Sequence, residues 1–288
     1  MRLEKIITLA NARVELHFNA MERSLRATGC QLPLWVIPYD DRRFKLPANA
    51  QWYEDASVFS WLDQATVPPY ARKYLCLLTA NYQFVDTDVV FLRNPLEMLA
   101  PYQGFVASCG HWHNPDQCVT PASRAWWHAR TTRWPAYTFN AGQFACDRSL
   151  FASAKELHEK VANPEFRAIC LDFQFHEQPG LNALVADSGV PFINLTMPPQ
   201  PMESTWAGDY PGDYASYWTT PERQPYLIHW AGLKPDGTRP IDDLFIGHLT
   251  TAEQAGWRAR LQSRAPASPL HRLRVRARAA YHAWKSAR

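Results

Sequence analysis

The sequence predicts an α/β protein with a mostly parallel sheet flanked by helices, and two observations lead to this prediction. Near the start of the chain, an apolar strand, an amphipathic helix and a second apolar strand follow one another within about 35 residues, which is typical of a βαβ unit. Further along, another apolar strand ends in two aspartates, Asp86 and Asp88. Ligands bind open α/β sheets at the carboxyl ends of the strands, so we expect a site at this edge.

The elements of the first half follow from hydrophobic periodicity. Short apolar runs predict buried strands, and an apolar stripe with a spacing of three or four residues predicts a helix. On this basis we expect strands over residues 5–10, 33–37 and 83–85, and helices over residues 14–27 and 71–80.

The second half is more irregular. Residues 100–165 are rich in aromatic side chains and loops, and a helix is expected over residues 154–162. The segment 197–225 is rich in Pro, Tyr, Trp and Gly, which predicts irregular surface structure or a lid. A last apolar strand, residues 226–228, ends at His229.

Composition excludes several classes of protein. The 288 residues are 47% hydrophobic and 20% charged, which suits a packed core and excludes global disorder. Apolar runs are far shorter than the roughly 18 residues needed to span a bilayer, and no signal-peptide core follows Met1. The six cysteines contain no CxxC pair, which indicates reduced thiols. We therefore expect a soluble, cytoplasmic protein.

The charge is distributed unevenly between a domain, residues 1–245, and a helical, basic tail, residues 246–288. Seven of the 30 basic residues and none of the 27 acidic ones lie in residues 264–288. From Leu270 onward, apolar and aromatic residues share one helical face with basic flanks, which favours a peripheral contact with an anionic membrane on the cytoplasmic side. A solvated terminus is the alternative. The acidic body argues against nucleic-acid binding.

The sharpest motif is the pair Asp86 and Asp88 inside the apolar stretch 84–91. Burying two unpaired carboxylates would cost several kcal/mol, so they need a cation or a bend into solvent. Carboxylate oxygens suit Mg²⁺ or Mn²⁺. The alternative is a strand end with two solvated acids.

Three weaker motifs follow in the chain. Each has a simple structural explanation on its own, as a turn, a helix cap or a single buried histidine. They are Phe139-Asn140-Ala141-Gly142, Glu177-Gln178 followed by Asn182, and His229-Trp230-Ala231-Gly232-Leu233-Lys234-Pro235.

The order of these motifs resembles nucleotide-sugar glycosyltransferases of the GT-A (Rossmann-like) fold, most closely glycosyltransferase family 8. The resemblance covers roughly residues 4–235 and implies a donor half, residues 1–95, and an acceptor half, residues 96–245. It implies Mn²⁺ or Mg²⁺ on Asp86, Asp88 and His229, with Asp86 also near the donor ribose. The diphosphate would be held by Gly232 and Lys234, with Arg72 near the diphosphate and the sugar. The donor sugar would lie at Asn140, Ala141 and Gly142, the nucleoside at Ala10, Asn11 and Asp40, and the catalytic residues Glu177 and Gln178 beside the anomeric carbon.

The implied reaction moves a hexose from a nucleotide-diphosphate sugar, with uridine as the expected base, to a saccharide or glycolipid-type acceptor with retention of configuration. The sequence departs from the family pattern at four places. Glu177 stands where an aspartate is usual, Leu233 alone separates Gly232 from Lys234, Asp236 replaces a tryptophan, and the first strand is followed by Ala10-Asn11-Ala12.

Two other functions compete. The stretch Asp86-Thr87-Asp88-Val89-Val90 also satisfies the DxDxV motif of haloacid-dehalogenase-type phosphatases, in which Asp86 would be the nucleophile and Asp88 the acid/base. A non-catalytic nucleotide- or saccharide-binding protein with the same fold is the second alternative. The tryptophans Trp112, Trp126, Trp127 and Trp134 suit either stacking on sugar rings or core packing.

Overall fold

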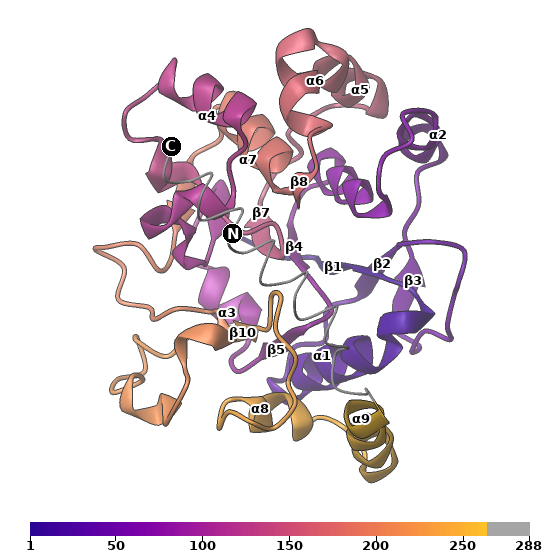
Figure 1. Cartoon of the computed structure of the whole chain (residues 1–288), viewed down its shortest axis with the longest axis vertical. Coiled ribbons are helices and arrows are strands. Elements are labelled where there is room, and N and C mark those ends of the chain that lie inside the picture. The colour runs from indigo at the N-terminus through magenta and orange to yellow at the C-terminus, as the bar shows by residue number, and fades with distance from the viewer. Residues whose placement is uncertain (264–288) are drawn as a thin grey trace, which may run out of the picture. The chain divides into compact units, whose positions relative to one another are not determined.

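A computed structural model describes residues 1–263 of the chain. Met1–His248 form one compact unit (Figure 1). Of the second unit, which starts at Leu249, the described part is helix α9 (Thr251–Ser263). The basic segment from residue 264 and the helix expected from Leu270 lie outside the described residues. Within the described residues, no helix has the length and apolar character required to cross a membrane.

The central sheet of the first unit has seven strands in the order β3-β2-β1-β4-β7-β6-β9. Only the two pairings made by β7 are antiparallel, so the other six strands run in one direction and the predicted mostly parallel sheet is confirmed. The strands are β1 (Lys5–Ala10), β2 (Leu34–Pro38), β3 (Ala50–Trp52), β4 (Tyr82–Val85), β6 (Phe105–Ala107), β7 (Gln143–Cys146) and β9 (Phe192–Asn194). A second, antiparallel sheet pairs β5 (Val89–Phe91) with β10 (Leu227–His229).

The helices flank this sheet on both faces. They are α1 (Glu15–Ala27), α2 (Ala56–Gln64), α3 (Pro95–Leu99), α4 (Pro121–His128), α5 (Ala154–Ala162), α6 (Pro164–Cys170), α7 (Gln178–Asp187) and α8 (Asp242–Ile246). The expected strands and helices near residues 5–38, 83–85, 154–162 and 226–228 lie within one residue of their predicted bounds.

The helix expected over residues 71–80 is a 3₁₀ helix, Pro69–Leu78. All five residues from Lys73 to Leu77 are buried, so the segment is packed on every side and lacks the one-sided apolar stripe of a surface α-helix. A 3₁₀ helix of ten residues is unusually long.

The core lies on both faces of the sheet because successive residues of a strand point to opposite sides. Ile7 and Leu9 of β1 belong to a cluster that includes α5, α6 and α7, whereas Ile6 and Ala10 belong to a cluster that includes α1. Figure 1 shows α1 on one side of the sheet and α5–α7 on the other.

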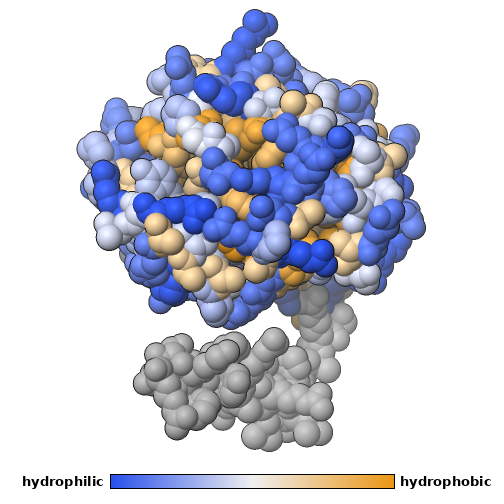
Figure 2. Space-filling model, turned by 90° about the horizontal axis from the view of Figure 1, so that it is seen from above, coloured by the Kyte–Doolittle hydropathy of each residue, from blue (hydrophilic) through white to orange (hydrophobic). Residues whose placement is uncertain are grey.

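The surface and the thiols agree with the composition. Figure 2 shows a face that is mostly hydrophilic, with apolar residues appearing in patches between hydrophilic ones. All six cysteines are unpaired and buried, as the sequence predicts.

Candidate active site

A cavity of about 830 Å³ opens at the carboxyl ends of the central strands. Its wall combines residues from the ends of β1 and β4, the loop before β7, the start of α7 and the segment around residues 204–209. The three motifs that are weak individually all contribute to this wall. The residues expected there that line it are Ala10, Asn11, Asp86, Asp88, Asn140, Ala141, Gly142, Glu177, Gln178, His229 and Gly232.

Asp86 and Asp88 occupy a bend between two strands. Strand β4 ends at Val85 and β5 begins at Val89, so the two carboxylates do not share the face of one continuous strand. Each side chain keeps over a quarter of its surface exposed. Asp86 contacts the ammonium group of Lys73, and Asp88 contacts the imidazole of His229. The bend into solvent, one of the two solutions expected for two acids in an apolar stretch, is therefore present.

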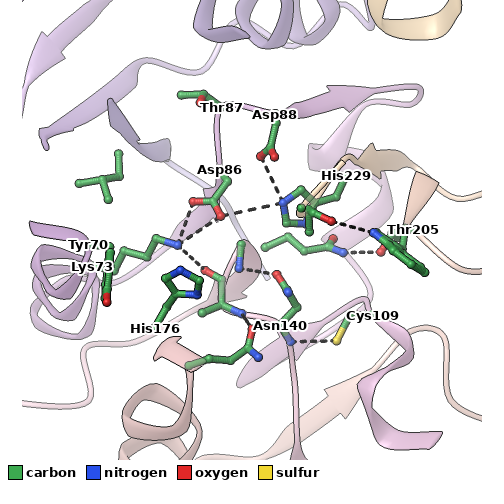
Figure 3. Close-up of a pocket in the computed structure, with 18 of the residues that line it drawn as sticks. Tyr70, Lys73, Asp86, Thr87, Asp88, Cys109, Asn140, His176, Thr205 and His229 are labelled. Carbon is green, nitrogen blue, oxygen red and sulfur yellow. Dashed lines mark hydrogen bonds and ion pairs between the residues drawn. The ribbon is translucent and has the colours of Figure 1, made fainter. Parts of the chain in front are cut away.

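His229 is brought to these acids by strand pairing. In the β5–β10 ladder it lies opposite Val89, directly after Asp88. Its Nε2 is 3.2 Å from Asp88 Oδ1 and 3.9 Å from Asp86 Oδ2. One ligand atom from each of the three residues lies within 4.8 Å of the others. Figure 3 shows the three side chains directed toward one another.

The donor set fits a divalent cation in chemistry and in space. Two carboxylates and one imidazole are ligands that Mn²⁺ and Mg²⁺ accept. Gly142 keeps the centre open, because a Cβ atom there would lie 2.2 Å from His229 Cε1 and 2.6 Å from Asp86 Oδ2. A metal is therefore compatible with these three residues and with the glycine beside them.

The acids and the imidazole stabilise one another's charged forms. Burial would lower the pKa of His229, but the carboxylates of Asp88 and Asp86 outweigh it and the pKa lies above its usual value. Burial would raise the pKa of Asp88, but the imidazole of His229 holds it below the usual value. A cation bound here would replace the proton on the imidazole.

Lys73 completes a buried cluster that the sequence did not predict. Its Nζ lies 2.9 Å from Asp86 Oδ1, 2.7 Å from Glu177 Oε1 and 3.3 Å from the carbonyl oxygen of Ala141. Burial would lower the pKa of Lys73, but the two carboxylates outweigh it and the pKa is raised. We call Lys73, Asp86 and Glu177 the buried charge cluster.

The predicted basic residue of this segment was the neighbouring Arg72, which is not among the residues lining the cavity. Its guanidinium donates a hydrogen bond to the carbonyl oxygen of Pro38 at 2.8 Å and lies over the ring of Phe59. A signal for Lys73 existed in the sequence, since it directly precedes a run of apolar residues ending at Leu78. A charge in that position needs a partner.

The loop before β7 and the start of α7 form one unit. Gln178 accepts a hydrogen bond from the backbone N–H of Ala141 at 3.0 Å. Asn182 accepts one from the N–H of Phe139 at 2.8 Å and donates one to the carbonyl oxygen of the same residue at 2.9 Å. The predicted Asn-Ala-Gly and Glu-Gln motifs therefore hold each other in place beside the acids.

At the end of the cavity where we expect the nucleoside, the polar side chains form hydrogen bonds with one another. The amide of Asn11 donates to Asp40 Oδ2 at 2.8 Å, and Asp40 also accepts from the guanidinium of Arg42. The hydrogen bond from Arg42 lowers the pKa of Asp40 to about 2, although burial opposes the shift. Ala10 and Asn11 line the cavity, and Asp40 supports Asn11 from behind.

Of the two residues expected to hold the diphosphate, one lines the cavity and the other does not. Gly232 lines the cavity and has a positive φ of 71°, which favours glycine. Lys234 is exposed and does not belong to the cavity wall.

A scan against protein-family models finds no match, and no curated protein sequence matches the chain. Solved structures do match. WbbM, a bifunctional glycosyltransferase solved in its apo form, gives a TM-score of 0.59 at 14% identity over 90% of this chain and 52% of its own. The galactosyltransferase LgtC, solved with donor and acceptor sugar analogues, gives 0.56 at 16% identity over 88% of this chain and 99% of its own.

The chain has the GT-A fold. It spans about half the length of WbbM and nearly the whole length of LgtC. The predicted fold is thereby confirmed, and the phosphatase alternative, which needs a haloacid-dehalogenase fold, has no support among these neighbours.

The aromatic residues of this GT-A domain divide differently from the prediction. Trp126, Trp127 and Trp134 are buried and pack in the core, which removes them as candidates for sugar stacking. Trp206, which the sequence did not single out, lines the cavity and keeps 42% of its surface exposed.

Four further histidines line the cavity: His17, His111, His113 and His176. Burial, helped by the imidazoles of His229 and His113, lowers the pKa of His111 to about 4, so it is neutral at pH 7. Among the described residues, the only three-residue cluster with metal-ligand spacing is Asp86, Asp88 and His229.

Proposed function

We propose that this chain is a metal-dependent glycosyltransferase that moves a hexose from a nucleotide-diphosphate sugar to an acceptor hydroxyl. One observation carries the proposal: on a GT-A fold, two carboxylates and an imidazole converge within 4.8 Å in the wall of a cavity of about 830 Å³. A cavity of this size suits a nucleotide sugar.

Asp86, Asp88 and His229 would hold the cation, with Mn²⁺ and Mg²⁺ as the candidates. When bound, the cation would neutralise charge on the diphosphate leaving group. Gly232 lets the backbone approach the phosphates closely, and Lys234 could add a cation from the exposed side of the same loop. For the nucleoside we assign the ends of β1 and β2, with uridine as the base implied by the resemblance.

The donor sugar would rest on Asn140, Ala141 and Gly142, beside Glu177 and Gln178. Glu177 already contacts Lys73 at 2.7 Å, and the amide of Gln178 cannot take up a proton. Neither side chain is therefore a free general base. This supports front-face attack with retention, in which the leaving phosphate accepts the proton of the acceptor hydroxyl. Inversion at the anomeric carbon, detected by NMR of the product, would overturn that part of the proposal.

Calorimetric titration of UDP into the protein, with Mn²⁺ and then with EDTA, tests the donor site. We expect binding that requires the metal and that Asp88→Ala abolishes. Asp243→Ala is the matched control, because Asp243 is an exposed acid of α8 that does not line the cavity. Metal-dependent binding of another nucleotide in place of UDP would change the base. Binding of no nucleotide would contradict the transferase.

An assay of UDP release distinguishes an enzyme from a non-catalytic binding protein. Released UDP is measured with UDP-glucose and UDP-galactose as donors and water as the acceptor. Metal-dependent release that Asp88→Ala lowers by about 100-fold or more is the expected result. Tight UDP binding without any release would favour the non-catalytic alternative.

A further inference from the structure

Trp206 presents a large, mostly apolar side chain in the wall of the cavity. It is 42% exposed and lines the same cavity as Asp86, Asp88 and His229. The other large hydrophobic residues with comparable exposure among the described residues, Tyr137 and Tyr217, lie outside the cavity wall. An indole exposed in the wall of a cavity is a candidate ligand contact, since a ligand would cover it.

Both the backbone and the indole of Trp206 are held in place by neighbouring residues. The backbone N–H of Trp206 donates to Ser204 Oγ at 3.1 Å, and its Nε1 donates to the carbonyl oxygen of Ala231 at 3.0 Å. A β-bridge joins Trp206 to His229. The ring lies over Gly208, where a Cβ atom would be 2.4 to 2.6 Å from ring carbons. This preorganisation lowers the entropic cost of binding a ligand on the ring.

We infer that Trp206 is the stacking platform for the acceptor sugar, which rests the C–H face of a pyranose ring on the indole. The inference rests on the proposed function, because the other parts of the cavity are assigned by it. The nucleoside is assigned to the ends of β1 and β2, and the donor sugar to residues 140–142 and Glu177. Trp206 belongs to neither group.

The position of Trp206 next to the metal ligands supports the acceptor. Its bridge to His229 and its hydrogen bond to Ala231 put it where the transferred sugar and the attacking hydroxyl meet. An apolar ring face does not bind phosphate, but it matches the apolar face of a sugar. Asp209, an exposed carboxylate that also lines the cavity, can accept hydrogen bonds from the sugar hydroxyls.

Direct binding of simple glycosides tests the platform without the donor. Saturation-transfer NMR with methyl β-D-galactopyranoside and methyl β-D-glucopyranoside should show contact through the ring C–H protons of at least one of them. We expect Trp206→Ala to weaken binding about tenfold, the effect of losing one aromatic stacking partner and its buried area. Trp206→Phe should retain part of the affinity.

Two further variants keep the test independent of gross misfolding. Gly208→Ala leaves the indole in the chain but displaces it, so it should weaken glycoside binding as well. Tyr217→Ala is the matched control, because Tyr217 is 41% exposed on the same segment and does not line the cavity. It should leave binding unchanged. UDP binding in the presence of Mn²⁺ should be the same in all four variants.

The outcomes are distinct. If Trp206→Ala weakens UDP binding and leaves glycoside binding unchanged, the ring stacks on the nucleobase and the inference is overturned. It is also overturned if neither glycoside binds the unaltered protein. If glycosides bind through Trp206 while UDP with Mn²⁺ does not bind at all, the donor proposal fails and the saccharide platform stands.

Discussion

The buried charge cluster and the ion pair of Asp40 with Arg42 show how differently the same attraction acts at two depths of one protein. Lys73 keeps 7% of its side-chain surface exposed, whereas Arg42 keeps 48%. Water screens the exposed pair, so its net contribution to stability is small. Lys73 and Glu177, with 7% and 3% of their side-chain surfaces exposed, are largely cut off from water and depend on their charged partners. The comparison shows that the fold already positions the charged side chains of the cavity wall through their contacts with one another, before a ligand binds.

Removing the cation of the buried charge cluster should have the largest effect. Lys73→Met leaves Asp86 and Glu177 without their shared partner, and we expect the free energy of unfolding to fall by about 3–5 kcal/mol. Urea denaturation measures it. Lys155→Ala, which removes an 83% exposed lysine paired with Glu159, should change stability by less than about 0.5 kcal/mol.

The double variant Lys73→Met/Glu177→Gln sharpens the comparison. It removes one uncompensated charge, so part of the lost stability should return. Equal loss in the single variants at Lys73 and Lys155 would mean that the cluster is hydrated like a surface pair.

Gly142→Ala should have an intermediate effect that concerns binding more than stability. The added methyl group needs the space between His229 and Asp86, and overpacking of this kind costs about 1–3 kcal/mol. We expect metal-dependent UDP binding to be lost in calorimetry while the circular dichroism spectrum stays native. Gly212→Ala is the control, because a Cβ atom there meets nothing within 4 Å. Normal UDP affinity in Gly142→Ala would argue against a metal between these side chains.

The exposed pair should give the smallest effect, and its pH dependence has a definite sign. The pKa of Asp40 is lowered from 3.8 to about 2 in the folded state. The stabilisation is therefore present above pH 3.8 and is lost as the pH falls toward 2. Because the pair is exposed, we expect Asp40→Asn to cost less than about 1 kcal/mol at neutral pH. Urea unfolding curves of Asp40→Asn and of the unaltered protein should differ slightly at neutral pH and should coincide at about pH 2.

The fold and the convergence of Asp86, Asp88 and His229 could be predicted from the sequence because their signals are local. The apolar strand before Asp86 and the one before His229 are visible as short runs, and the order of the motifs supplies the connection between them. Asp88 directly precedes β5, and His229 is the last residue of β10, which pairs with β5. The loop at Asn140 and the start of α7 were assigned to the same site through the order of the motifs that resembles the family.

Lys73 and Trp206 could not be assigned because their surroundings are set by distant contacts. Lys73 contacts Asp86 and Glu177, whereas the adjacent Arg72 contacts the carbonyl oxygen of Pro38, and all of these partners are distant in sequence or in separate elements. The exposure of Trp206 depends on Gly208 beneath its ring and on Ala231 across the cavity wall. By contrast, Trp126 and Trp134 follow the default for tryptophan, which is core packing.

The pairing of β5 with β10 also determines the stage of folding and of synthesis at which the site can form. It joins residues 89 and 229 and so closes a loop of about 140 residues, which carries a large entropic cost before any contact repays it. Contacts between such distant residues form late in folding. During synthesis, Asp86 and Asp88 leave the ribosome long before His229. Under the proposed function, a nascent chain cannot bind the cation with all three residues until the ribosome has made almost all of the GT-A domain.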